Sequence, residues 1–137
     1  MASLTMATVS VQANLLSFKA KSVAEWGPAR QDGIYSVYRS NNWIIAEVYD
    51  GWGTAVVTRF LKLDKTPFTQ DEIIQCDQDN LLPVPDPMVE LPTLHDGTRV
   101  YSNGTFWVLI GETSDGTPFR SYASKPGWKL LTKKASM

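Results

Sequence analysis

Residues 32–60, DGIYSVYRSNNWIIAEVYDGWGTAVVTRF, set the architecture that this chain can adopt. Three short runs rich in Ile, Val, Tyr, Trp and Thr are separated by Asn41-Asn42 and by Asp50-Gly51-Trp52-Gly53. β-Branched and aromatic residues favour strands, whereas Asn and Gly pairs favour the tight turns of hairpins. The stretch therefore predicts a β-meander with strands over 33–39, 43–50 and 54–63.

A meander of this kind has an apolar face that a second layer must cover. In its middle strand, alternation places Ile44, Ala46 and Val48 on one side, and we expect that side to face the core. The length of 137 residues fits one domain over residues 1–137. We predict a mainly-β fold, either a β-sandwich or a flattened barrel built from antiparallel meanders.

The last third of the chain carries the signals of further hairpins. The turn pairs Asp96-Gly97, Asn103-Gly104 and Asp115-Gly116 separate runs of strand-forming residues. The predicted strands lie over 98–101, 105–110, 119–122 and 128–131, before a basic tail over 132–137. The order Asp-Gly, Tyr, Trp, Glu and Asp-Gly in residues 32–51 recurs with slipped spacing in residues 96–116, so a duplicated ribbon and a chance repetition both stay open.

The segment between the two β regions has a different character. Thr69-Gln70-Asp71-Glu72 matches a capping box, which predicts a short helix over 70–76. Four prolines follow within residues 81–92, and proline fixes an extended backbone and removes sheet donors. We therefore predict a proline-rich extended arm or crossover over 81–92.

Residues 1–22 are rich in Ala and Ser, contain two lysines and have no acidic residue. That composition is typical of an organellar leader that is cleaved from the mature protein. However, Val9, Val11, Ala13 and Leu15 alternate as in a strand, and the segment has no arginine. The first 22 residues are therefore interpreted as an N-terminal strand or arm, with a cleaved leader as the alternative.

Composition and charge exclude several classes of protein. With 43% hydrophobic and 20% charged residues, the chain has the composition of an ordinary globular domain. Its apolar runs are far shorter than the about 20 residues of a membrane-spanning helix, so no membrane partner is expected. A net charge of -1 gives no overall attraction to nucleic acid. An acidic middle lies between two basic ends, which could pair with it in the same chain or in a neighbour.

No stretch carries a recognised catalytic, cofactor or metal motif. One Cys and one His cannot complete a closed zinc site, and Cys76 and His95 lie in no nucleophile signature. Glu47 and Glu112 each lie near a Trp, and a glycosidase needs two such carboxyl groups across its cleft. We nevertheless expect no enzyme activity, no cofactor, no catalytic residue and no bound metal.

Exposed aromatic and charged side chains are the remaining candidates for function. Trp52 lies between two glycines and is the best candidate for an exposed ring, since flat aromatic faces bind sugars or anchor protein interfaces. Nucleic acid is the least expected ligand, because the rings near Trp43 and Trp52 are not interleaved with basic residues. The full set of candidate interaction residues is Trp52, Trp43, Trp107, Trp128, Lys129, Lys133, Lys134, Asp86 and Glu90.

These observations favour a non-enzymatic structural or interaction protein that acts through sheet surfaces and extended arms. The leading hypothesis is a homo-oligomeric virion cement, decoration or tail subunit, whose partners are copies of itself or a larger assembly. A carbohydrate-binding module that uses Trp52 with Trp43, Trp107 or Trp128 is the first alternative. An organellar protein with a cleaved leader is the second alternative. The expected location is the virion under the leading hypothesis and the cytoplasm otherwise.

Overall fold

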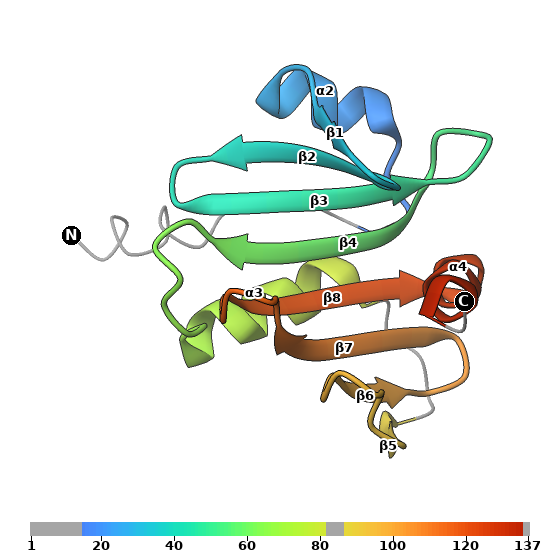
Figure 1. Cartoon of the computed structure of the whole chain (residues 1–137). Coiled ribbons are helices and arrows are strands. Elements are labelled where there is room, and N and C mark those ends of the chain that lie inside the picture. The colour runs from blue at the N-terminus through green and yellow to red at the C-terminus, as the bar shows by residue number, and fades with distance from the viewer. Residues whose placement is uncertain (1–14, 82–86, 136–137) are drawn as a thin grey trace.

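One antiparallel sheet of eight strands forms the body of the protein (Figure 1). The structure is a computed structural model that describes residues 15–81 and 87–135. The strands are β1 (Arg30–Asp32), β2 (Tyr35–Ser40), β3 (Trp43–Tyr49), β4 (Ala55–Lys62), β5 (Val89–Leu91), β6 (Arg99–Ser102), β7 (Phe106–Glu112) and β8 (Pro118–Ser124). The helices are α2 (Lys19–Trp26), α3 (Gln70–Asn80) and α4 (Lys125–Ala135). No described helix is long and apolar enough to cross a bilayer.

The strand order is β1-β2-β3-β4-β8-β7-β6-β5, so two four-stranded meanders meet where β4 pairs with β8. The predicted mainly-β antiparallel fold is confirmed. The two meanders, however, join edge to edge in one open sheet, and the expectation of two facing sheets or a barrel is wrong in that respect. The burial of β4 on both faces suits it to the centre of a sheet. The outer strands β1 and β5 have only three residues each, which limits the open edges.

Helices cover both faces of the sheet. On one face, which we call the α3 face, Cys76 of α3 and Trp26 of α2 pack with Tyr38, Ile45 and other side chains of the strands. On the opposite face, the α4 face, Trp128 and Leu131 of α4 pack with side chains that include Trp107 and Phe119. The Trp107 and Trp128 rings stack at 5.8 Å with an interplanar angle of 8°. The second layer is therefore helical rather than a second sheet.

The prediction for the faces of the middle strand β3 is confirmed in part, since Ala46 and Val48 are buried and Ile44 is half-buried. Ile44, Ala46 and Val48 do lie on one side, but the opposite side is the more deeply buried, because Ile45 and Glu47 are both 0% exposed. The helices of the α3 face cover that side. Alternation in a strand shows which residues share a face, but not which face receives the deeper layer.

The helix predictions have mixed outcomes. The capping box at α3 is confirmed, since Thr69 Oγ1 accepts from the Glu72 amide at 3.2 Å and Glu72 Oε1 accepts from the Thr69 amide at 2.8 Å. The predicted strand over 128–131 is wrong, because these residues lie in α4. A short apolar run fits a buried helix as well as a strand.

Gly127 lets α4 approach β4 closely, because an added Cβ would lie 1.9 Å from the Val56 carbonyl oxygen.

The remaining segments include parts outside the described residues. Of the predicted N-terminal strand or arm, Phe18 forms an isolated bridge with Thr54, and α2 begins at Lys19. Of the predicted proline-rich arm, residues 82–86 are not described, and Val89–Leu91 forms the edge strand β5. The Asp-Gly turns are confirmed as connections within the second meander, with positive φ at Gly97 and Gly116. The predicted basic tail forms part of α4 up to Ala135.

Candidate functional site

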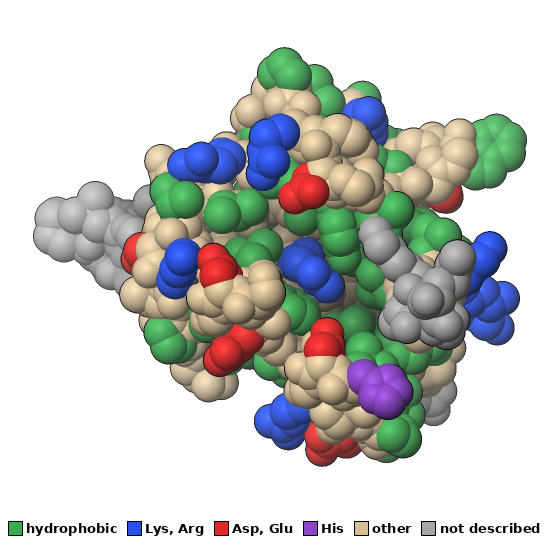
Figure 2. Space-filling view, viewed as in Figure 1, with side chains coloured by type: hydrophobic (Ala, Val, Ile, Leu, Met, Phe, Trp, Pro, Cys, Tyr) green, Lys and Arg blue, Asp and Glu red, His purple; other side chains and the backbone are tan. Residues whose placement is uncertain are grey.

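The α4 face of the sheet is hollowed beside the helix, and Figure 2 shows a basic side chain at the floor of this hollow. One part of the hollow has a volume of about 540 Å³, and an adjoining part has about 420 Å³. Both parts are lined by Arg59 of β4 and by Thr113 of the β7–β8 turn. We call these two parts together the Arg59 hollow.

Arg59 is held in the hollow by contacts from two other strands. Its guanidinium carbon lies 4.1 Å from the centre of the Phe119 ring and 5.1 Å from that of Tyr35. Its Nε–H donates to Ser121 Oγ at 2.6 Å. Because β2 and β8 supply these groups and β4 carries Arg59, the guanidinium is fixed by the register of the sheet. Such cation–π contacts attract the charge without neutralising it.

The charge of Arg59 has no ion-pair partner among the described residues, since no described carboxylate oxygen lies within 4.0 Å of it. Its terminal Nη groups likewise make no hydrogen bond within the described part of the chain, where only Nε is bonded. Burial lowers the pKa of Arg59, while the charges of Tyr35 and Asp96 raise it. Arginine stays protonated under such conditions.

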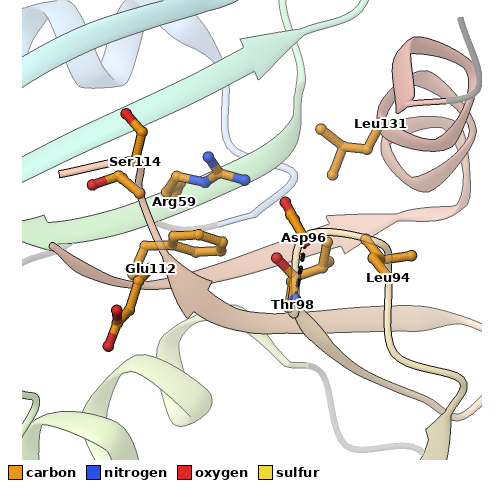
Figure 3. A pocket seen from close by; sticks show the side chains of 10 residues that line it. Arg59, Leu94, Asp96, Thr98, Glu112, Ser114 and Leu131 are labelled. Carbon is orange, nitrogen blue, oxygen red and sulfur yellow. Dashed lines mark hydrogen bonds between the residues drawn. The ribbon is translucent and has the colours of Figure 1, made fainter. Parts of the chain in front are cut away.

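The walls of the hollow are mainly apolar. Leu94, Leu109 and Leu131 line the larger part, and Val37 and Ala46 line the smaller one. Figure 3 shows Arg59 between Ser114 of the β7–β8 turn and Asp96 of the β5–β6 turn, whereas the carboxylate of Glu112 points away from it. A fixed cation beside apolar walls, with the exposed Arg30 at the smaller part, suits binding of a ligand rather than proton transfer or nucleophilic attack.

The rim of the hollow is built from two ordered turns. Asp96 Oδ1 accepts from the Thr98 amide at 3.0 Å, and hydrogen bonds from Thr98 lower the pKa of Asp96. In the β7–β8 turn, Asp115 accepts from Thr113 and Thr117, and hydrogen bonds from these two residues and from Lys65 lower the pKa of Asp115. Asp96 therefore places negative charge beside the positive floor, whereas Asp115 lines neither recess and pairs with Lys65 at 3.1 Å.

A second polar cluster lies buried on the α3 face, around Glu47. Glu47 Oε1 accepts from Ser22 Oγ at 2.6 Å and from the hydroxyl of Tyr49, which in turn lies 2.9 Å from the Tyr38 hydroxyl. Glu47 Oε2 and Thr58 Oγ1 are buried without a hydrogen-bond partner among the described residues, although Glu47 and Thr58 are paired across β3 and β4. Burial raises the pKa of Glu47, although the hydroxyl groups of Ser22, Tyr49 and the neighbouring Thr58 and the charge of Lys21 oppose the shift.

The other candidate chemistry of the sequence is not assembled in the structure. Glu47 lines neither part of the Arg59 hollow, so it does not face Glu112 across this recess. Cys76 is buried, and burial raises the pKa of its thiol to about 12. No hydrogen bond joins Cys76 to His95, which is exposed in the β5–β6 turn. No cluster of three or more metal-binding side chains occurs in residues 15–81 and 87–135.

The predicted interaction tryptophans differ in exposure. Trp52 is 88% exposed at the tip of the β3–β4 turn, which projects past the sheet in Figure 1. Trp43 and Trp107 are only 7% and 8% exposed, so the interpretation of these two as surface rings is wrong. Trp128 is half-buried against Trp107. A strand Trp is buried when helices cover its face, and the local sequence does not contain that information.

The predicted charged residues are more dispersed. Lys129 and Lys133 are exposed on α4, and Glu90 of the edge strand β5 pairs with Arg99 at 3.4 Å. Asp86 lies outside the described residues, and so does the side chain of Lys134.

Charge pairing between the basic end and the acidic middle occurs within the chain. Arg120 Nη2 lies 3.0 Å from Asp77 Oδ1, which ties β8 to α3. Lys62 adds a second tie to α3 through Glu72 at 2.6 Å.

Arg59 is the residue that the sequence analysis missed. It is a charged residue inside the apolar run AVVTRFL of residues 55–61, and a charge in the middle of a central strand is unusual. That position could have marked Arg59 as a candidate functional residue. The hollow around it, however, is formed by strands that are far apart in the sequence.

A comparison with known protein families and one with curated proteins find no match to this chain. Among solved structures, the chain is similar to a DUF4309 family protein (YjgB) from Bacillus subtilis subsp. subtilis str. 168. The two share 16% sequence identity with a TM-score of 0.51, over 85% of this chain and 84% of that one. At this level of identity, the likeness shows that the two proteins share a fold and nothing about function.

Proposed function

We propose that this chain is a non-enzymatic protein that acts by binding, and that the Arg59 hollow is its binding site. The observation that carries the proposal is the pair of adjoining recesses, of about 540 and 420 Å³, that share one fixed cation. Sites for small ligands commonly measure about 300–1,000 Å³ and combine apolar walls with a few placed polar groups. The hollow has both properties.

Blocking the hollow tests this proposal. Ser114 is exposed and lines the larger recess, so Ser114→Trp places a large side chain at its rim without removing a core contact. The matched control is Thr105→Trp, at an exposed turn that lines neither recess. A library of small organic fragments is screened against the ¹⁵N-labelled full chain by NMR. We expect fragments to shift the amides that line the hollow in the unmodified chain and in the control, but not in Ser114→Trp. Shifts confined to the α3 face, or unchanged in Ser114→Trp, would contradict the proposal.

Trp52 supports a second candidate, namely anchoring of the chain in a larger assembly such as the coat or tail of a virion. Its ring is exposed while the turn beneath it is ordered, since Asp50 Oδ1 accepts from the Trp52 amide at 2.9 Å and from the Thr54 amide at 3.0 Å. Rigid exposed aromatics are frequent anchors at protein interfaces. Light scattering of the native chain and of Trp52→Ala, with electron microscopy of native particles, tests it. A dilute monomer with no associated particle would exclude the assembly role.

The carbohydrate-binding alternative now has fewer tryptophans available to contact a sugar. With Trp43 and Trp107 buried, a sugar-binding platform would depend on Trp52 alone or with the half-buried Trp128. Full-strength glycan binding by Trp52→Ala would exclude that version.

The cleaved-leader alternative concerns residues 1–22, of which 1–14 lie outside the described residues. Sequencing the N-terminus of the native protein decides it.

A further inference from the structure

We infer that Arg59 binds the carboxylate of a small organic acid whose apolar body lies along the walls of the hollow. The inference rests on the proposed function and adds the chemical class of the ligand. A guanidinium presents its N–H groups in a planar fork that matches a carboxylate. At Arg59, the Nε edge is bonded to Ser121, and the terminal Nη groups have no bonded partner among the described residues.

Two of the other arginines have a carboxylate partner, whereas the exposed Arg30 and Arg39, like Arg59, have none within 4.0 Å among the described residues. Arg120 is paired with Asp77 and Arg99 with Glu90. Arg59 is more deeply enclosed than Arg99, yet it lacks a carboxylate within 4.0 Å among the described residues. A desolvated cation is costly unless an anion compensates it. Ring contacts from Tyr35 and Phe119 hold its guanidinium in place beforehand, which lowers the cost of binding such an anion.

The charges around the hollow favour a ligand with a single negative charge over a polyanionic ligand. Among the described residues, Arg59 is the one cation that lines the larger recess, and the lining acids Asp96 and Glu112 would repel a phosphate or nucleotide. The smaller recess adds Arg30 and Asp32, which carry opposite charges. The remaining lining is largely apolar, with Leu94, Leu109 and other leucine and aromatic side chains. A monocarboxylate with an aliphatic or aromatic body satisfies both conditions.

Octanoate and its neutral analogue octanamide provide a matched pair of probes. Each is titrated, below the concentration at which octanoate forms micelles, into the ¹⁵N-labelled full chain, and the backbone amides and the Arg59 Nε–H signal are followed by NMR. We expect octanoate to shift the Arg59 Nε–H signal and to bind about tenfold or more tightly than octanamide, because hydrogen bonds to charged groups are among the stronger ones. Arg59→Met should remove this preference, while Arg99→Met, at an exposed arginine, should keep it.

The outcomes separate this inference from the proposed function. If octanamide binds as tightly as octanoate to the hollow, Arg59 is not a carboxylate anchor, but the hollow remains a binding site. If octanoate leaves the Arg59 Nε–H signal unchanged, the inference is wrong. If Arg59→Met does not fold, the comparison of the two probes on the unmodified chain still decides between these results.

Discussion

Replacing the buried acid Glu47 by glutamine should stabilise the protein, and the gain should grow as pH rises. The Glu47 side chain is 0% exposed, and its Oε2 atom lies buried without a partner among the described residues, as does Thr58 Oγ1 on the neighbouring strand. Glutamine keeps an oxygen that can accept from Ser22 and Tyr49, and it gains an NH₂ group that can donate to Thr58. A buried polar group without a partner costs about 1–3 kcal/mol, so we expect a gain of that order near pH 8.

The pH dependence follows from the direction of the pKa shift. Burial raises the pKa of Glu47 above its ordinary value of 4.5, while hydrogen bonds and Lys21 only partly oppose the shift. Between 4.5 and the raised pKa, the folded state therefore holds a proton that the unfolded state has lost. Stability falls as pH rises through this window, by at most about 1.4 kcal/mol per pH unit. Glu47→Gln carries no titrating proton, so it should escape this loss.

Urea unfolding followed by tryptophan fluorescence, between pH 4 and pH 8, measures both effects. We expect the two proteins to have similar free energies of unfolding at pH 4 and to diverge as pH rises. Glu112→Gln is the matched control, because Glu112 is exposed and should change stability little. A Glu47→Gln protein that is less stable than the unmodified chain at pH 8, or a difference that does not change with pH, would refute this reasoning.

Three further predictions concern packing, capping and reactivity. Gly127→Ala should cost about 1–3 kcal/mol in urea unfolding, because its Cβ would lie 1.9 Å from the Val56 carbonyl oxygen, whereas Gly51→Ala, with open space around the site, should cost far less. Thr69→Ala should lower the free energy of unfolding by about 1 kcal/mol through loss of the α3 cap, and no change would show that the cap is dispensable. Cys76 should resist alkylation by iodoacetamide at pH 8 until denaturant is added, since its thiol is buried and its pKa is raised to about 12, and rapid labelling of the folded chain would contradict this.

Local sequence signals were sufficient to predict most of the strands and the N-terminal cap of α3. The strand predictions over 33–39, 43–50 and 54–63 correspond to β2, β3 and β4, because alternation and Asn or Gly turns act over a few residues. The capping box likewise needs only residues 69–72. The pairing of β4 with β8, which joins the two meanders, could not be predicted from local signals. These strands are far apart in the chain, and no local feature encodes their pairing.

The candidate site was harder to predict than the fold. Trp52 was identified because glycines on both sides mark an exposed turn. Arg59 was missed because its environment is assembled from Tyr35, Phe119 and Ser121, which come from other strands. The helix α4, which forms one wall of the hollow, was predicted as a strand, and so the shape of this face could not have been anticipated.

The central position of β4 also matters while the chain is being synthesised. Arg59 and its partner Ser121 are 62 residues apart, so the ribosome must add that whole segment before β8 can pair with β4. During this time β4 is an open edge rich in apolar residues, and such edges recruit other nascent chains. A charge in the middle of an open strand discourages that association. Arg59 should therefore protect the unfinished protein from aggregation, and its replacement by an apolar residue should reduce the soluble yield in cells even where the folded form is stable.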